Sequence, residues 1–435
     1  MISAKTSIVN SQIECYNSAV MTAERDRLKI ATVAPYLMGE KNIGGVQNYI
    51  TSLSPELERK GCDITVIGSG ARKQGENLVD ETVGFSIPFS MTNTSYKGTV
   101  FINLIIAKKL MQKVDPDVVW FHDPFASPVT SITLLQGLAL SRSNAVTDLI
   151  VHAYTQKLTQ TNKRLIMAGN LSGVTGFIAR RIDGRGAVSP PPAELWSRIM
   201  KEDADKYTIL PNPINTEFFT PVGAIFEDWG QDGSKILFFA GRHDKRKRLC
   251  DAIDALAILI RLGVKAKLMI AGNGDETKNA KKQVKRLGLE GFIEFLGFVT
   301  NEDLAKAYRT VGKKRGIFVA SSEDGEAFNR TIAEARASGA LVAATNIHGH
   351  RFSYGDERIF GEMTEPKDPQ DLAAKIKAQL DLPKELQGIR QELGVKFVRG
   401  NFSLPIVAQE VIKHHEKLLS LRKSDLRKRG VIYRK

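Results

Sequence analysis

The chain has 435 residues, 42% of them hydrophobic and 25% charged, as is ordinary for a globular protein. No apolar run approaches the roughly 18 residues that a spanning helix needs, so an integral membrane protein is not expected. The length predicts two domains with separate cores, and the formal net charge of +14 indicates an anionic partner.

The N-terminal segment, residues 1–26, lacks the basic start and long apolar core of a secretory signal. We therefore expect a flexible extension there. The three cysteines, Cys15, Cys62 and Cys250, are odd in number and widely spaced, which argues against a disulfide framework and against a zinc site. A reducing, cytoplasmic location fits this pattern best.

The first regular elements form a βαβ unit with a glycine-rich first turn. The apolar segment 28–35 predicts a buried strand and is followed by Gly44 and Gly45. Apolar residues at helical spacing then predict a helix that ends at Gly61, and residues 62–67 predict the next strand.

Further short strands complete a first domain over residues 27–206. Residues 117–121 predict a strand whose carboxyl end presents His122, and residues 149–151 and 186–189 predict two more. This half therefore has the elements of a parallel sheet.

The second domain, residues 207–400, shows a cleaner alternation of strands and helices. Strands are predicted at 235–240, 267–271, 292–296, 316–320 and 341–345, and helices at 248–262, 276–287 and 302–311, with one more bearing Glu334. Strands alternating with helices at this pitch predict a doubly wound parallel sheet. The fold class is therefore α/β, with two Rossmann-like domains facing a central cleft.

Positive charge is clustered at 245–248, 278–286, 313–315 and in a basic tail, residues 422–435. We interpret 278–286 as a solvated helix face, because apolar residues mark its opposite side. The tail has seven Lys or Arg against one Asp and predicts a peripheral contact with an anionic membrane. Nucleic acid is not expected, because no zinc finger, RNA-binding strand signature or basic zipper is present.

The most informative stretch is SSEDGEAFNRTIAEARASG, residues 321–339. It joins a strand end, a loop with Glu326, and a helix with Glu334. Ligands of open α/β sheets bind at such strand-to-helix loops, where free N–H groups and the helix dipole can hold a diphosphate. The pair resembles the E-x7-E signature of the GT4-type retaining glycosyltransferases, which have the GT-B fold. Seen alone, the pair would be explained better by a solvated capping glutamate and a solvated helix glutamate.

A second motif follows the strand 235–240. AGRHDKRKR resembles the family's G-R-x4-K loop, and the resemblance implies that Arg242 and Lys247 hold the donor diphosphate. Fixed cations there would stabilise the negative charge that a departing nucleoside diphosphate gathers.

Weaker motifs follow in the family's order. LMIAGNGDE is similar to the strand and G-x-G turn that approach the nucleotide, which implies donor contacts at Gly272 and Gly274. IEFLGFVTNEDLAKAY resembles the segment that flanks the base, where Val299 would lie. A lone G-x-G is otherwise only a turn.

The resemblance also assigns residues around the donor sugar. Gly44 and Gly45 match the family's N-terminal glycine loop, where close backbone approach to the donor requires the missing side chain. His122 matches a histidine that faces the sugar. Glu334 would take the ribose hydroxyls, while Glu326 would lie against the sugar. The helix 405–419 would pack back on the first domain.

Backbone amides at the start of the Glu334 helix would line the sugar and phosphate, and they belong to Phe328, Asn329, Arg330 and Thr331. The chain departs from the family here: Ala327 and Asn329 replace small glycines, and Arg330 adds a charge. The sugar loop also reads NIHGHRFSYGDE over 346–357 instead of running into G-x-P-E.

Two D-x-D sequences could suggest a metal. Asp115 and Asp117 precede a buried strand and so lie at its amino end, opposite the ligand edge; the other D-x-D spans 203–205. No His/Cys/Asp cluster has metal-ligand spacing, so neither a metal nor another cofactor is expected.

These motifs predict a retaining, metal-independent hexosyltransferase that uses a nucleotide diphosphate sugar and the hydroxyl of a glycan, lipid or small molecule. The alternative from another class is a catalytically eroded GT-B-like protein that binds a nucleotide or an anionic surface. A sugar-nucleotide epimerase shares the architecture, but the E-x7-E pair favours the transferase.

Overall fold

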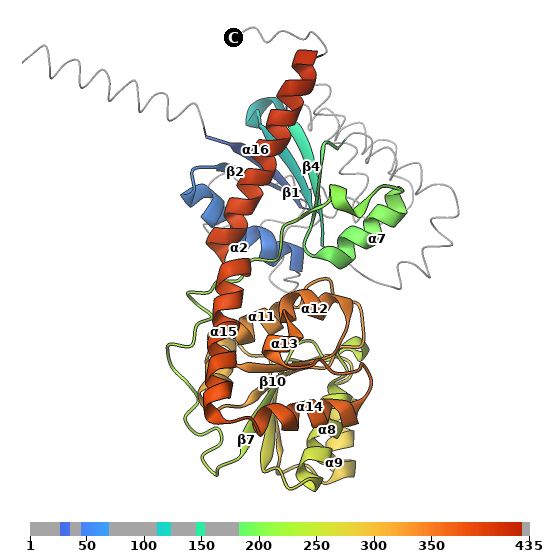
Figure 1. The fold of residues 1–435 in the computed structure, drawn as a ribbon, viewed down its shortest axis with the longest axis vertical. Coiled ribbons are helices and arrows are strands. Elements are labelled where there is room, and N and C mark those ends of the chain that lie inside the picture. Colours follow the sequence, from blue (N-terminus) through green and yellow to red (C-terminus); the bar gives the residue numbers. More distant parts are fainter. Residues whose placement is uncertain (1–26, 35–44, 69–110, 123–144, 153–181, 429–435) are drawn as a thin grey trace, which may run out of the picture. The chain divides into compact units, whose positions relative to one another are not determined.

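The computed structural model describes residues 27–34, 45–68, 111–122, 145–152 and 182–428, and they build two parallel sheets with helices (Figure 1). The described residues up to Leu149, with 182–184 and 412–428, form one compact unit. Those at 150–152 and 185–411 form the second, and the division runs through two strands of the first sheet.

The first sheet has six strands in the order β2-β1-β3-β4-β5-β6. Their bounds are β1 (Lys29–Ala34), β2 (Asp63–Gly68), β3 (Val118–His122), β4 (Val146–Val151), β5 (Gly184–Ala187) and β6 (Thr208–Ile209). β1 pairs in parallel with both β2 and β3. The winding direction therefore reverses between β1 and β3, at the edge where His122 ends its strand.

The helical segments named beside these strands are α2 (Gly45–Arg59), α7 (Pro190–Met200), the 3₁₀ turn η1 (Ala204–Lys206) and α16 (Leu404–Lys428). The Trp120 ring in β3 meets the Tyr49 ring of α2 with centroids 5.8 Å apart and the His415 ring of α16 at 5.1 Å. Asp148 in β4 is fully buried and pairs with His414 (3.2 Å) and His415 (3.1 Å). Aromatic packing and a buried carboxylate thus fasten α16 to this sheet.

The second sheet has five strands in the order β11-β10-β7-β8-β9. Their bounds are β7 (Lys235–Ala240), β8 (Ala266–Ala271), β9 (Ile293–Gly297), β10 (Ile317–Ala320) and β11 (Leu341–Ala344). β7 pairs in parallel with β8 on one side and with β10 on the other. The sheet is therefore doubly wound, with its switch point between β7 and β10.

The helices of this part are α8 (Leu249–Arg261), α9 (Thr277–Leu287), α10 (Asn301–Lys313), α11 (Arg330–Ala337), α12 (His348–Tyr354), α13 (Glu357–Phe360), α14 (Pro369–Leu380) and α15 (Lys384–Phe402), with a 3₁₀ turn η2 (Lys245–Lys247). Alternate strand residues face opposite layers. Leu237 and Phe239 join the core under α8, α9 and α14, whereas the Phe238 ring meets Tyr308 of α10 at 5.5 Å. Both faces of the sheet are covered.

The predicted α/β fold class with two parallel sheets is confirmed. β6 pairs with β5 in the first sheet, so that sheet extends past residue 206, where we expected the second domain to begin. α16 also continues to Lys428, beyond the expected helix end at 419 and into the basic tail. None of the helices in the described part of the chain has the length and apolar character that a membrane crossing requires.

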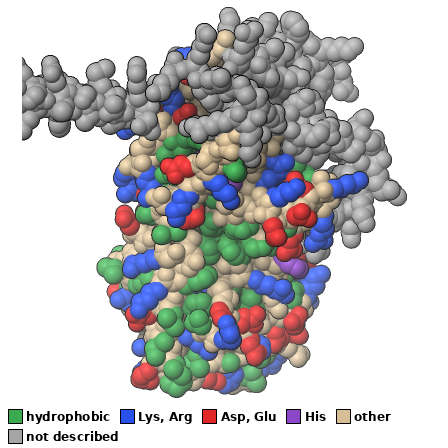
Figure 2. All heavy atoms as spheres, turned by 45° about the horizontal axis from the view of Figure 1, so that its top comes forward, with side chains coloured by type: hydrophobic (Ala, Val, Ile, Leu, Met, Phe, Trp, Pro, Cys, Tyr) green, Lys and Arg blue, Asp and Glu red, His purple; other side chains and the backbone are tan. Residues whose placement is uncertain are grey.

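The basic clusters are spread over separate elements. The α9 cluster is a solvated face as expected, because Ala280 and Val284 are the buried residues of that helix. Arg422, at the start of the predicted tail, pairs with Asp183 at 3.0 Å. On the face shown in Figure 2, Lys and Arg side chains are interspersed with Asp and Glu, so positive charge does not gather into one patch there. Residues 1–26 and 429–435 lie outside the described residues.

Candidate active site

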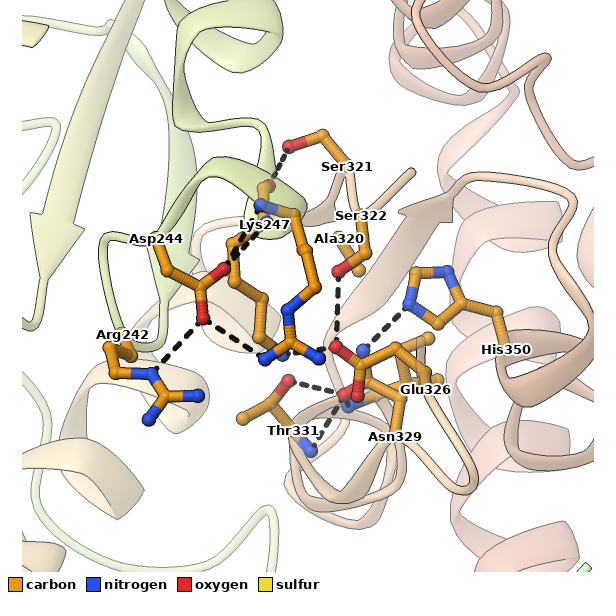
Figure 3. A network of polar contacts seen from close by, with 12 residues as sticks. Arg242, Asp244, Lys247, Ala320, Ser321, Ser322, Glu326, Asn329, Thr331 and His350 are labelled. Carbon is orange, nitrogen blue, oxygen red and sulfur yellow. Dashed lines mark hydrogen bonds and ion pairs between the residues drawn. The ribbon is translucent and has the colours of Figure 1, made fainter. Parts of the chain in front are cut away.

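Three predicted site residues meet at the switch point of the second sheet. Arg242 and Lys247 follow β7, and Glu326 follows β10, which is the neighbour of β7 (Figure 3). In open α/β sheets, ligands bind outside the carboxyl ends of the strands at such a point. The structure therefore brings the two family-like loops to the edge where a ligand is expected.

Hydrogen bonds tie these two loops together. The buried Ser321 hydroxyl donates to the carbonyl oxygens of Lys247 (3.1 Å) and Arg248 (3.0 Å). The backbone N–H of Glu323 donates to the carbonyl of Arg246 at 2.8 Å. The basic loop is thus positioned by the loop that carries Glu326.

Lys247 and Glu326 form an ion pair at the centre of this edge. The lysine Nζ lies 2.8 Å from Glu326 Oε1, and the two side chains are 20% and 16% exposed. The Ser322 hydroxyl lies 3.4 Å from the same oxygen. Burial opposes ionisation of Glu326, but the Lys247 ammonium outweighs it and holds the pKa of this carboxyl below its usual value. The site therefore holds a carboxylate and an ammonium in contact.

Arg242 presents its cation toward solvent. Its side chain is 69% exposed, and its Nε lies 3.1 Å from Asp244 Oδ2. The other oxygen of Asp244 accepts the backbone N–H groups of Arg246 (3.0 Å) and Lys247 (3.2 Å). Asp244 therefore shapes the turn that presents Lys247 and also restrains Arg242.

Gly272 and Gly274 allow the loops after β7 and β8 to pack closely. Both have positive φ, and a Cβ at Gly272 would clash with the carbonyl oxygen of Gly241. A Cβ at Gly274 would clash with the backbone of His243. The structure thus gives both glycines a packing role that does not depend on a ligand.

Val299 lies in the short connection between β9 and α10, half-buried. The next residue, Thr300, caps α10 by accepting the N–H of Asp303 at 3.1 Å. Phe298, which precedes Val299, exposes 88% of its surface. The predicted base-flanking segment therefore holds a large apolar side chain in solvent.

The start of α11 is organised by Asn329. Its Oδ1 accepts the N–H groups of Thr331 (3.1 Å) and Ile332 (3.4 Å) and the Thr331 hydroxyl (2.6 Å). Phe328 instead buries its ring against Phe402, with centroids 5.1 Å apart. The buried ring of Phe328 therefore takes no part in this edge, and the predicted backbone contact with a donor stays a prediction.

Arg330 and Glu334 pair within α11. Arg330 Nε lies 3.4 Å from Glu334 Oε1, and the Glu334 side chain is 8% exposed. Burial raises the pKa of Glu334 above its usual value, although the Arg330 guanidinium opposes that shift. The charge that departs from the family pattern therefore helps to keep the second glutamate ionised.

The predicted site residues of the first sheet are described separately. His122 is the last residue of β3 and is buried, with its ring 4.5 Å from that of Trp120 and 5.6 Å from that of Tyr49. Gly45 begins α2, and among the described residues nothing lies within 4 Å of where a Cβ would stand. Gly44 lies outside the described residues.

The D-x-D residues have local roles. Asp117 lies just before β3, and its Oδ2 accepts the backbone N–H of Lys29 at 2.9 Å, which aligns β1 with β3. Asp203 precedes the 3₁₀ turn that contains Asp205. Across the ranges that the structure describes, no group of three His, Cys, Asp or Glu side chains is arranged to hold a metal ion.

Sequence analysis missed three members of the site: Asp244, Ser321 and His350. Asp244 could have been found from its place before a turn of three basic residues, since Asp is a favoured cap. His350 could not, because its contact with Asn329 joins residues 21 positions apart.

Two family models match the chain. The model described as glycosyl transferases group 1 matches residues 223–392, and the model described as glycosyltransferase family 4 matches residues 43–218. The phosphatidyl-myo-inositol mannosyltransferase of Mycobacterium tuberculosis is 25% identical over 350 residues, covering 80% of this chain and 85% of that protein.

Solved structures agree in fold. A glycosyltransferase from Rickettsia africae superposes with a TM-score of 0.68 at 20% identity, covering 91% of this chain and 99% of the other. The HepE protein of Anabaena, solved in complex with UDP, gives 0.69 at 17% identity and covers 90% of this chain and 100% of its own. With its two doubly wound sheets and both family segments, this chain belongs to the GT4-type glycosyltransferases of the GT-B fold.

Proposed function

We propose that the chain transfers a hexose from a nucleotide diphosphate sugar to an acceptor hydroxyl, with retention of configuration and without a metal. The observation that carries the proposal is the contact between Lys247 and Glu326 at the switch point, beside the capped start of α11. It supplies a cation for the leaving diphosphate and a carboxylate for the sugar within one cluster.

The charges match the chemistry. A departing nucleoside diphosphate gathers negative charge, and Lys247 and Arg242 both follow β7 at the edge where it would leave. The positive dipole end of α11 adds to this field. Fixed donors aimed at developing charge are typically worth about 3 kcal/mol each in the transition state.

The comparisons support a nucleotide sugar as donor. HepE was solved with UDP, and the mycobacterial relative is named as a mannosyltransferase. Mannose is therefore the first hexose to test. The relative's name also makes a lipid hydroxyl the first acceptor to test.

Retention follows from attack on the face that the diphosphate leaves, with the leaving phosphate taking the acceptor's proton. Glu326 is held by Lys247 at 2.8 Å and serves here as a positioning carboxylate for the sugar. The anomeric coupling constant of the product, measured by NMR, tests the stereochemistry. A β product from an α-linked donor, or a sugar attached covalently to Glu326, would contradict this mechanism.

The primary experiment is a thermal-shift screen over UDP, GDP, ADP and their hexose conjugates. A ligand at 100 times its dissociation constant should stabilise the fold by about 2.7 kcal/mol. Lys247→Ala should weaken that response, whereas Lys245→Ala, which changes an exposed cation of the same turn, should preserve it. A screen without any response in the unaltered protein would refute the proposed donor class.

We also propose a cytoplasmic location with a peripheral contact at an anionic membrane, made through the end of the basic tail. Each basic residue near such a surface contributes about 1 kcal/mol, less at high salt. Removing residues 429–435 leaves α16 intact and should reduce sedimentation with vesicles that contain anionic lipid. Unchanged sedimentation would contradict the tail's role.

A further inference from the structure

A buried chain of hydrogen bonds lies behind Glu326 and connects β11 to the start of α11. His350, in α12, is fully buried. Its Nε2 lies 2.8 Å from Asn329 Nδ2 (Figure 3). Its Nδ1 lies 3.0 Å from the carbonyl oxygen of Thr345, which follows β11. The imidazole therefore bridges two segments that both adjoin the proposed donor site.

The partners of Asn329 determine which ring nitrogen of His350 carries the proton. Asn329 Oδ1 accepts from two backbone N–H groups and from the Thr331 hydroxyl, so the amide oxygen must face α11. Its NH₂ group then faces His350 and can only donate. Nε2 must accept this hydrogen bond, so the proton of the neutral ring is on Nδ1.

Thr345 leads independently to the same tautomer. Its hydroxyl lies 2.6 Å from the carbonyl oxygen of Ser322 and must donate its hydrogen there. The same hydroxyl lies 3.2 Å from His350 Nδ1 and has only a lone pair left to offer. Nδ1–H therefore donates toward both oxygens of Thr345.

The surroundings keep this ring neutral. Burial lowers the pKa of His350 to about 4, although Glu326 favours the charged form and Lys247 opposes it. The neighbouring Gly349 packs against the backbone of Glu326 so closely that a Cβ would clash with its carbonyl oxygen. The loop carrying Glu326 thus rests on the same turn of α12 that supplies His350.

We propose that His350 is a positioning residue for the donor site, where its Nδ1–H tautomer fixes the Asn329 amide so that the amide oxygen caps α11. This inference rests on the proposed function. Without the Nε2 acceptor, the buried NH₂ group of Asn329 lacks a hydrogen-bond partner, and any shift of the side chain toward another acceptor pulls the amide oxygen away from the N–H groups of Thr331 and Ile332. The amides that face the donor phosphate would then lose their fixed arrangement.

Three variants separate this role from a general effect on folding. His350→Leu removes both polar contacts, His350→Gln retains an acceptor for Asn329, and Asn329→Asp keeps the cap but removes the donor to His350. We expect His350→Leu to raise the KM for the nucleotide sugar and the Kd for its nucleoside diphosphate by about five- to tenfold, as loss of an N-cap implies, with the acceptor KM unchanged. His350→Gln should recover most of that loss.

Asn329→Asp gives a readout that no simple loss of packing would produce. The new carboxylate can only accept, so it favours a proton on Nε2, while Thr345 still requires one on Nδ1. The ring should become doubly protonated and its pKa should rise toward neutrality. Binding of the nucleoside diphosphate, insensitive to His350 titration in the unaltered protein above pH 5, should then weaken as the pH rises through the new pKa.

The measurements are calorimetric titrations with UDP, GDP and ADP from pH 5.5 to 8 and ¹⁵N NMR of the imidazole, with circular dichroism as the folding control. An Nε2–H tautomer in the unaltered protein, or an unchanged Kd in a folded His350→Leu variant, would overturn the inference. If His350→Leu does not fold, the nucleotide affinities of His350→Gln and Asn329→Asp test the inference instead. Failure of the unaltered protein to bind any of the three nucleotides would instead refute the proposed function, and with it the donor role of His350, while the NMR result would still stand.

Discussion

Lys247→Ala should lower stability as well as activity, because it leaves Glu326 as a largely buried carboxylate without its nearest cation. The ammonium and carboxylate lie 2.8 Å apart, and both side chains are at most one-fifth exposed. At an effective dielectric constant of about 20, two unit charges at this separation attract by about 6 kcal/mol before desolvation is subtracted.

Desolvation of both groups offsets most of that attraction. Breaking a fully buried pair by removing one partner costs about 3–5 kcal/mol. Because this pair keeps some contact with water, we expect a smaller loss than that range, about 2 kcal/mol in the free energy of unfolding at neutral pH. Lys247→Ala should also lower the transfer rate by about 100-fold or more.

The pH dependence of the stability shows whether the loss comes from the Lys247–Glu326 ion pair. The pKa of Glu326 lies below its unfolded value, so the pair stabilises the fold above the unfolded-state pKa, and this contribution is lost as the pH falls through the folded-state pKa. Without Lys247, burial should raise the pKa of Glu326. The buried carboxylate then destabilises the fold at neutral pH, and this effect disappears in acid because the carboxylate becomes protonated. The difference between the two proteins should therefore shrink as the pH falls.

Urea unfolding of the unaltered protein, Lys247→Ala, Lys247→Ala/Glu326→Gln and the exposed control Lys245→Ala measures each quantity. The double variant should recover at least half of the stability lost in the single variant, because no charge is then buried alone. Activity should not recover with it, since the cation for the diphosphate is still missing. Equal stability of Lys247→Ala and the unaltered protein at neutral pH would refute the reasoning.

Three other changes test separate parts of the molecule. Arg242→Ala should reduce transfer by about 100-fold with an unchanged unfolding curve, because this exposed side chain contributes little to packing, and near-normal turnover would remove it from the site. EDTA should leave the transfer activity unchanged. If EDTA abolishes the activity and magnesium or manganese restores it, the enzyme must have a metal site. Asp148→Asn should lower the free energy of unfolding by about 1–3 kcal/mol, because His414 and His415 lose a buried charged partner. A urea midpoint equal to that of the unaltered protein would show that this contact does not fasten α16.

The second sheet was predictable from sequence because each strand is a short apolar run followed by a helix with clear ends. The strand predicted at 235–240 matches β7, and the helix predicted at 302–311 lies within α10. The first sheet was harder. β5 contains only Gly184–Ala187, whose sequence does not alternate between apolar and polar residues. β6 has two residues and is defined by its pairing with β5, which the local sequence does not indicate.

In the candidate site, too, the positions of residues in loops were predictable, but contacts between residues far apart in the sequence were not. The positions of Arg242, Lys247 and Glu326 in loops at one sheet edge could be predicted, because these loops follow predictable strands. Their roles come from the family resemblance and stay predictions. Their contacts could not be predicted, since an ion pair between residues 247 and 326 depends on β7 and β10 being neighbours. The side chain of Phe328 likewise joins an aromatic cluster with Phe402, a residue far along the chain.

Two departures from the family pattern, Asn329 and Arg330, are matched by partners in the structure. Asn329, where a glycine is usual, caps α11 and is held by His350 from the altered sugar loop. Arg330, where an apolar residue is common, pairs with Glu334. If the chain had simply lost its function, its polar replacements would have no reason to find hydrogen-bond partners. Buried polar groups without partners would then destabilise the fold. Asn329 and His350 come from separate segments and contact each other at 2.8 Å, and such a matched pair argues against the catalytically eroded alternative.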